Sequence, residues 1–218
     1  MRETTPFDVQ AAIAAVKPTL AVPAEVSGQP VLVMLCGLPG TGKSSLARRL
    51  AMRWPAVVIE SDRIRHTLFV PPTYTAEEAR HVHQICHILI GWYLRHTDRD
   101  GKLRRHHVIY DATNLYEYHR QLVVRLAERH EARLVVVEVT AHDGVVRERL
   151  ASRQAGGVLG HSSGQGEYSD ADWEIYRRMR QRAEPIQGEH VTVDTGHDRI
   201  EPAVEQVLLA IGGDTSRG

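Results

Sequence analysis

Five short runs of apolar, mostly β-branched residues alternate with longer stretches of helical pattern, and this alternation constrains the fold more than any other feature of the sequence. The runs are VLVMLC (31–36), AVVIE (56–60), HVIYD (107–111), RLVVVEV (133–139) and HVTVD (190–194). Helices are expected at 43–53, 62–68, 76–97, 116–130, 143–154, 170–184 and 199–211. Buried strands separated by helices predict an α/β fold in which helices cover both faces of a parallel sheet.

The segments outside this alternation divide the chain into parts. Residues 1–30 are expected to form a short helix at 7–16 and a connector, residues 31–212 the main domain, and residues 213–218 a flexible tail. The stretch 155–169 is rich in glycine and long for a connector. Such a segment predicts a mobile lid.

Composition excludes several classes of protein. The 218 residues are 42% hydrophobic, which suffices for a domain with its own core. Lysine plus arginine and aspartate plus glutamate each number 27, so no net charge draws the chain to nucleic acid, although a local basic groove is compatible with this balance. The two cysteines, Cys36 and Cys86, lack metal-site or disulfide spacing, which favours the cytoplasm. Without an apolar leader or a run of membrane length, no membrane location is expected.

A phosphate-binding motif, G-x-x-x-x-G-K-S, occupies residues 37–44 between the first predicted strand and the first helix of the main domain. Its glycines let backbone N–H groups surround a polyphosphate, and the following helix adds its positive end. Lys43 is expected to reach the β- and γ-phosphates, and the Ser44 hydroxyl to bind Mg²⁺. The predicted contacts with ATP are made by Gly37, Leu38, Pro39, Gly40, Thr41, Gly42, Lys43, Ser44 and Ser45.

The third strand ends in the sequence Asp111-Ala-Thr-Asn, without a second acid of the kind found in many ATPase motors. The guanine signature N-K-x-D is also missing from the sequence, which counts against a GTPase switch. Asp111 is expected to hold Ser44 or a magnesium-bound water, with Thr113 and Asn114 facing an acceptor. A plain turn after a buried strand is the structural alternative.

Asp62 and Arg65 follow the second strand at a spacing that places them on one face of a helix. In open α/β sheets ligands bind at this edge of the sheet. Asp62 there could accept the proton of an attacking hydroxyl, and Arg65 could hold an anionic group of the acceptor. Alternatively, Ser61 or Asp62 caps the helix and Arg65 is merely solvated.

The motifs together resemble a known family. GLPGTGKSSLARRLA, SDRIR, VIYDATN with Arg120, RERLASR and DADWEIYRRMRQRAEP are similar to the AAA-type P-loop kinase-like family, which includes the kinase domain of polynucleotide kinase and, more distantly, zeta-toxin and chloramphenicol phosphotransferase proteins. The resemblance covers residues 31 to 210. It implies a P-loop NTPase three-layer sandwich with strand order 2-3-1-4-5.

The resemblance also assigns roles to residues. It makes Asp62 the base and Arg65 an acceptor-binding arginine, and it places Arg149 and Arg153 of the lid against the transferring phosphate. Arg120, on the first turns of the next helix, could reach either the acceptor or merely solvent. A solvated amphipathic helix is the alternative for the segment with Arg149 and Arg153.

The chemistry expected is transfer of the γ-phosphate of ATP, with Mg²⁺, to a hydroxyl of a small-molecule acceptor. Two alternatives stay open: a polynucleotide 5′-hydroxyl kinase, which the charge balance does not favour, and a regulatory module that binds ATP without transferring phosphate. The histidines near Cys86 are not expected to bind metal, and the basic run 177–182 is expected on an exposed face.

Overall fold

The computed structural model describes residues 7–156, 171–196 and 199–213. Five parallel strands form one sheet in the order β2-β5-β1-β6-β7. They are β1 (Val31–Cys36), β2 (Val57–Glu60), β5 (Val108–Asp111), β6 (Arg133–Thr140) and β7 (Val191–Asp194). Counted within this sheet alone, the order is the expected 2-3-1-4-5. The labels differ because a separate two-stranded hairpin, which was not predicted, supplies β3 and β4.

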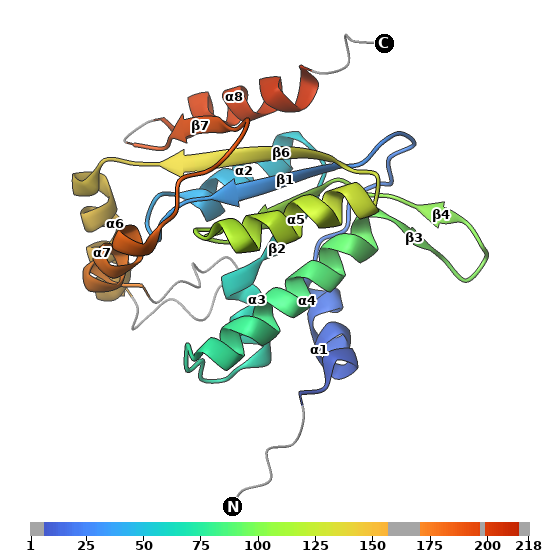
Figure 1. The fold of residues 1–218 in the computed structure, drawn as a ribbon, viewed down its shortest axis with the longest axis horizontal. Coiled ribbons are helices and arrows are strands. Elements are labelled where there is room, and N and C mark those ends of the chain that lie inside the picture. The colour runs from blue at the N-terminus through green and yellow to red at the C-terminus, as the bar shows by residue number, and fades with distance from the viewer. Residues whose placement is uncertain (1–6, 157–170, 197–198, 214–218) are drawn as a thin grey trace, which may run out of the picture.

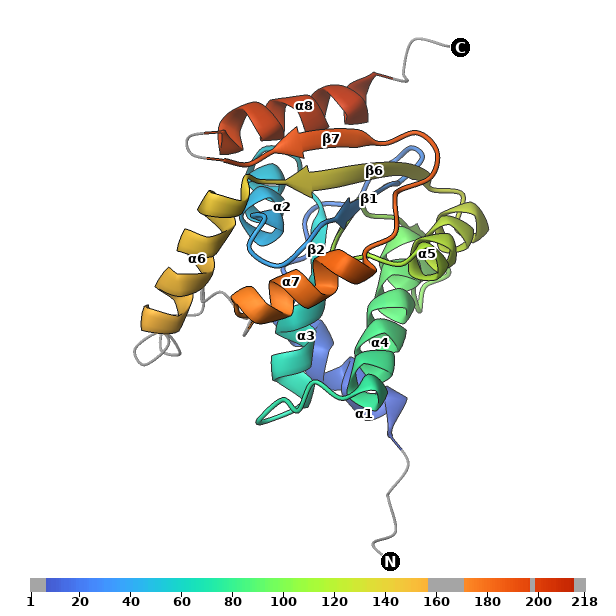
Figure 2. The same ribbon diagram turned by 60° about the vertical axis from the view of Figure 1, so that its left-hand side comes forward.

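Helices cover both faces of the sheet, as predicted (Figures 1 and 2). They are α1 (Val9–Val16), α2 (Lys43–Arg53), α3 (Ser61–Leu68), α4 (Ala76–Leu94), α5 (Glu117–Arg129), α6 (Asp143–Gly156), α7 (Trp173–Arg182) and α8 (Ile200–Gly212), with a short 3-10 turn, η1 (Lys17–Thr19), after α1. One apolar core joins the sheet to α1, α4 and α5, and a second joins it to α2 and α8.

The central strand β1 shows why the sheet is enclosed. All six of its residues are buried. Successive side chains of a strand point to opposite faces, so Leu32 and Met34 enter the first core while Val33 and Leu35 enter the second. The carboxyl ends of the strands meet at one edge, beside which α6 and α7 lie (Figure 1). Ligands of open α/β sheets bind at that edge.

The helix expected at 76–97 is too long. α4 ends at Leu94, and β3 (His96–Thr97) pairs with β4 (Leu103–Arg104) as an antiparallel hairpin. The Asp98 carboxylate accepts hydrogen bonds from the backbone N–H groups of Asp100 and Lys102 and from Arg104. An aspartate that satisfies turn N–H groups in this way competes with helix formation, so the chain reverses where the apolar periodicity suggested another helical turn.

Two expected segments fall largely outside the described residues. The predicted lid at 155–169 has only Ala155 and Gly156 within them, at the end of α6, and the predicted tail at 213–218 has only Gly213. Among helices in the described ranges, none combines the length and the apolar character needed to cross a membrane.

The N-terminal helix α1 is part of the first core. Ala12, Val16 and Leu20 are buried there together with Ile64 of α3. The ring of Phe7 stacks on His81 of α4, with 4.0 Å between ring centroids. The N-terminal segment is therefore fixed against the two helices, α3 and α4, that follow the edge strand β2.

We expect Val16→Ala to destabilise the protein by about 2 kcal/mol, because it removes fully buried methyl groups and leaves a cavity. Val22→Ala, at a side chain that is 48% exposed, is the matched control and should change the free energy of unfolding by less than about 0.5 kcal/mol. Urea denaturation of both variants measures the difference. Equal stability of the two would show that α1 is not part of the cooperative core.

Candidate active site

The phosphate-binding loop connects β1 to α2, and its path depends on glycine. Gly40 and Gly42 have φ angles of +80° and +89°, which side chains rarely adopt. A Cβ on Gly40 would lie 2.8 Å from Val146 Cγ1, and one on Gly42 would lie 2.7 Å from Thr195 Oγ1. The loop is thus packed closely against α6 and the segment after β7.

Lys43 begins α2 and is buried, with its Nζ donating a hydrogen bond to the Leu38 carbonyl oxygen at 2.9 Å. Burial lowers the pKa of its ammonium group, and the carboxylates of Asp111 and Asp62 act in the opposite direction. A lysine held inside the loop near two acids is placed to bind the β- and γ-phosphates of a nucleotide.

Asp111 ends β5 directly beside β1, in register with Leu35. Burial raises the pKa of its carboxyl group, while Lys43 and a hydrogen bond with Ser44 act to lower it. Its Oδ2 atom is buried without a hydrogen-bond partner. A buried carboxylate oxygen left unpaired beside a serine hydroxyl fits Mg²⁺, which binds few protein oxygens and completes its shell with phosphate and water. In the described ranges no group of three or more histidine, cysteine or acidic side chains could hold a metal ion.

A cavity of about 390 Å³ joins this loop to the predicted acceptor side. Lys43, Ser44 and Asp111 line one part of it, and Asp62 and Arg65 of α3 line another. The N-cap position of α3 belongs to Glu60, whose side chain makes no capping hydrogen bond. Ser61 begins the helix, as the capping alternative expected, but the cap lies one residue earlier. Asp62 lies in the first turn of the helix, at the cavity wall.

Arg65 is held by a partner that sequence reasoning missed. Its guanidinium is 2.6 Å from Glu78 Oε1 of α4, and both side chains are buried. Glu78 Oε2 also accepts hydrogen bonds from the N–H and the hydroxyl of Thr73. Burial alone would raise the pKa of Glu78, but these hydrogen bonds and Arg65 lower it to about 2. The fixed carboxylate keeps the Arg65 guanidinium oriented at the cavity.

The sequence contains one indication that Glu78 has a structural role, the spacing Thr75-x-x-Glu78. It is typical of a capping box, in which the acid reaches back to the first residue. Thr75 does cap α4 by accepting from the Glu78 N–H. The Glu78 side chain, however, turns to Arg65 and Thr73, a tertiary contact that spacing along the chain does not reveal.

Two predicted acceptor-binding residues do not reach the cavity. Asn114 is buried and its Nδ2 donates to the Leu35 carbonyl oxygen at 2.7 Å. Arg120 is also buried and donates to the carbonyl oxygens of Asn114 and Pro185. Both therefore brace the turn after β5, whose polar groups would otherwise be unpaired. Thr113 does line the cavity, and its carbonyl oxygen accepts from the Gly37 N–H.

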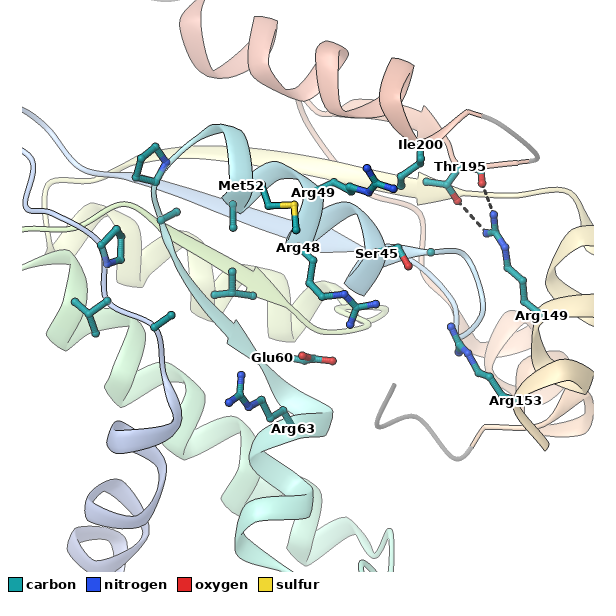
Figure 3. A pocket seen from close by; sticks show the side chains of 18 of the residues that line it. Ser45, Arg48, Arg49, Met52, Glu60, Arg63, Arg149, Arg153, Thr195 and Ile200 are labelled. Atoms are coloured by element: carbon teal, nitrogen blue, oxygen red, sulfur yellow. Dashed lines mark hydrogen bonds between the residues drawn. The ribbon is translucent and has the colours of Figure 1, made fainter. Parts of the chain in front are cut away.

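The two arginines of α6 have different surroundings. Arg149 donates to Thr195 Oγ1 at 3.2 Å and to the Thr195 carbonyl oxygen at 2.5 Å (Figure 3). It also donates to the Gly40 carbonyl oxygen at 3.4 Å. It thus ties the phosphate-binding loop to the segment after β7. Arg153, one turn later, lines the cavity that contains Asp62 and Lys43. The basic run on α7 is exposed, as expected, and Ile175 and Met179 are the side chains of α7 that line the cavity.

Glu60 and His83 also line the cavity and were not predicted to be site residues. Burial, together with the nearby charges of Asp111 and Asp62, raises the pKa of Glu60 to about 7, against the opposing effect of Arg48. His83 shares a hydrogen bond of 3.0 Å with the hydroxyl of the buried Tyr110. No short motif marks either residue. Glu60 meets Arg48 only because α2 packs on the sheet, and His83 meets Tyr110 only because α4 does.

Comparisons with known proteins agree with this geometry. The family model described as an AAA domain matches residues 32–193. A protein of Chloroflexus aurantiacus assigned as a kinase is 17% identical, with a TM-score of 0.64 over 87% of this chain and 100% of that chain. The APS kinase of Mycobacterium tuberculosis, in complex with AMPPNP and APS, is 16% identical, with a TM-score of 0.56 over 84% and 98% of the two chains.

A gluconokinase of Sinorhizobium meliloti is 20% identical, with a TM-score of 0.52 over 84% of this chain and 93% of that chain. At these identities the structures establish similarity of fold. No curated protein matches the chain with significant sequence similarity.

Between pH 7 and pH 5 we expect the buried histidines to contribute a loss of stability, because burial lowers the pKa values of His83 and His87 to about 4, while the raised pKa of Glu60 acts in the opposite direction. An unfolded histidine has a pKa of about 6.5, so the unfolded chain binds more protons between about pH 6.5 and 4. The loss at pH 5 should be roughly 2 kcal/mol for each histidine. Denaturation at pH 7 and pH 5 measures it.

Relative to the wild type, His87→Gln should reduce the loss of stability between pH 7 and 5 by roughly 2 kcal/mol, because glutamine does not titrate. The matched control, His142→Gln, removes an exposed histidine and should leave the loss unchanged. If His87→Gln and the wild type lose the same stability between pH 7 and 5, the buried histidine is not the source of the effect.

Proposed function

The chain belongs to the AAA-type P-loop kinase-like family, and on that premise we propose that it is an ATP-dependent kinase that transfers the γ-phosphate to a hydroxyl of a small-molecule acceptor. One observation carries the proposal: a single cavity brings together Lys43 and Ser44 of the phosphate-binding loop with Asp62 and Arg65 of α3. A module that only binds ATP has no use for a carboxylate and a buried guanidinium opposite the loop. The cavity therefore favours an enzyme over a regulatory module.

The reaction follows from the placement of these groups. The Asp62 carboxylate accepts the proton of the acceptor hydroxyl, and the hydroxyl oxygen bonds to the γ-phosphorus. The bond between that phosphorus and the β–γ bridging oxygen breaks, and ADP leaves with the electron pair. Lys43 neutralises charge on the β- and γ-phosphates. Arg153, which lines the same cavity, adds a second positive charge beside the transferring group.

Mg²⁺ would be held by the Ser44 hydroxyl and by Asp111. The Oδ2 atom of Asp111 is buried and has no hydrogen-bond partner. When bound, the ion would neutralise charge on the phosphates. Asp111 is fixed for this role by its place in β5, between β1 and β2. Asn114 and Arg120 support the same region by bracing the turn that follows Asp111.

A small acceptor is favoured by the volume and lining of the cavity. About 390 Å³ has to hold the transferring phosphate and the reacting part of the acceptor, and cavities of this size suit small molecules. Structural neighbours include a gluconokinase and an APS kinase, which act on small molecules. Equal numbers of acidic and basic residues give no overall attraction to a polynucleotide. Phosphorylation of a metabolite library, read by mass spectrometry, would identify the acceptor.

We expect Lys43→Ala to abolish phosphate transfer and to weaken binding of ATP, because the ammonium group is the cation of the loop nearest the β- and γ-phosphates. Isothermal titration with AMPPNP and a transfer assay on the acceptor found by the screen measure both effects. Arg53→Ala is the control, since Arg53 lies on the same helix and pairs with Glu205 of α8. Undiminished transfer by Lys43→Ala would contradict the assignment of the loop.

We expect Asp62→Asn to lower turnover by about 10²- to 10⁴-fold, because asparagine keeps the shape of the side chain but not its basicity. AMPPNP affinity and melting temperature should stay close to those of the wild type. Asp8→Asn, at the N-cap of α1, is the matched control and should leave turnover unchanged, since both residues cap helices well. Turnover of Asp62→Asn within about threefold of the wild type would be too high for loss of a general base.

A further inference from the structure

A second cavity, of about 1220 Å³, lies next to the first and shares Gly42, Glu60 and Arg153 with it. One end of this second cavity, around Ser45, Arg149 and Thr195, borders the phosphate-binding loop and belongs to the proposed nucleotide site. The other end lies between α2 and the edge strand β2. We call this end the edge lobe, formed by Ala21, Val22, Pro23, Arg48, Met52, Ala56, Val58, Glu60 and Arg63.

The edge lobe carries excess positive charge. Arg48 of α2 and Arg63 of α3 lie on either side of Glu60, and all three side chains are directed into the cavity (Figure 3). Among the residues that line the lobe, these two guanidinium groups face one carboxylate, although the charges of Asp62 and Asp111 in the first cavity also act on Glu60. In a chain without net charge, this local excess favours an anionic ligand. Arginine is suited to phosphate because its donors match the geometry of the phosphate oxygens.

The N-terminal segment builds one wall of the edge lobe. Ala21, Val22 and Pro23 line it, and they precede residues 32–193, which the family model matches. Arg63 donates a hydrogen bond of 2.6 Å to the Thr19 carbonyl oxygen. A guanidinium group has five N–H donors, so this contact orients Arg63 and leaves donors for a ligand. Because α1 is packed into the core, the wall is held in place.

The position of the edge lobe relates it to the acceptor. Glu60 lines both the lobe and the first cavity and lies two residues before Asp62. A molecule whose hydroxyl reacts at Asp62 can therefore extend past Glu60 toward Arg48 and Arg63. The apolar side chains of Ala56 and Val58, which also line the lobe, suit the carbon skeleton between the two polar ends of such a molecule.

We propose that the edge lobe binds a phosphate group that the acceptor already carries, so that the substrate is a small phosphorylated molecule with a free hydroxyl. This inference rests on the proposed kinase function and narrows its substrate class. The N-terminal segment then serves as a wall of the substrate site, in addition to its place in the core. No covalent step occurs in the lobe, whose arginines bind and orient the phosphate.

The test uses the full chain saturated with AMPPNP and Mg²⁺, titrated by calorimetry with glycerol 3-phosphate and with glycerol. We expect glycerol 3-phosphate to bind at least about tenfold more tightly, because only it carries a phosphate for charge-assisted hydrogen bonds. Arg63→Gln should reduce this preference to about threefold or less, while Arg53→Gln on α2 should keep it. Equal binding of the two compounds by the wild type would overturn the proposal.

A second pair of variants guards against misfolding of Arg63→Gln. Val22 is 48% exposed, so both Val22→Glu and Val22→Gln should fold. Val22→Glu adds a carboxylate to the lobe and should bind glycerol 3-phosphate about tenfold more weakly than Val22→Gln, which has a similar shape without the charge. Equal affinities of the two variants would overturn the proposal.

Two further measurements distinguish failure of the edge lobe from failure of the kinase function and a small acceptor from a polynucleotide. AMPPNP affinity is measured in the same samples, so failure to bind AMPPNP contradicts the kinase function, whereas normal AMPPNP binding without phosphate preference contradicts the edge lobe alone. A competition experiment tests the size of the acceptor. A tetrathymidylate with a free 5′-hydroxyl and glucose 6-phosphate are each used to displace glycerol 3-phosphate. If the tetrathymidylate does so at a concentration at least tenfold lower than glucose 6-phosphate, the small-molecule assignment is overturned; if glucose 6-phosphate does so at the lower concentration, the assignment is supported.

Discussion

The insertion of β5 between β1 and β2 is the constraint on which the site depends. Asp111 is in register with Leu35 of β1 on one side and with Glu60 of β2 on the other. This pairing places the Asp111 carboxylate beside the phosphate-binding loop and the Glu60 carboxylate at the start of the helix that carries Asp62. Because parallel neighbours require long crossovers, residues that are distant in sequence meet at the carboxyl edge only through this strand order.

The pairing concentrates charge that has to be balanced within the protein. Three carboxylates, those of Glu60, Asp62 and Asp111, lie close together. Asp62 and Asp111 raise the pKa of Glu60, Asp62 raises that of Asp111, and both aspartates oppose the lowering of the Lys43 pKa by burial. Burying like charges is costly unless cations or hydrogen bonds accompany them. Lys43 supplies part of the balance now, and a bound magnesium nucleotide would change it by adding a cation beside Asp111. The site is thus electrostatically prepared for a ligand that brings both a metal ion and phosphates.

The sequence was most informative where chemistry is local. The loop at 37–44 and the strands that flank it were predicted, because glycine conformations and β-branched runs act over a few residues. The order of the strands in the sheet came from the family resemblance. Arg65 was identified, but its partner Glu78 was not, because the pair joins two helices through tertiary packing. Asn114 and Arg120 were placed at the acceptor because they follow Asp111 closely. They brace the backbone instead, since a buried turn must satisfy its own carbonyl and N–H groups before it can serve a ligand.

The difference between local sequence patterns and tertiary packing also explains why the role of the N-terminal segment was not predicted. Its short helix and connector were predicted as an appendage, because nothing in their spacing links them to the phosphate-binding loop. In the structure α1 packs on α3 and α4, and Thr19 orients Arg63 next to the proposed base. Helices that border an acceptor site need support from outside the sheet when they follow an edge strand, because the sheet covers only one of their sides. An added segment in that place supports the helices and also shapes the cavity beside them, so one packing solution determines both the rigidity of the acceptor side and the surface that a substrate meets.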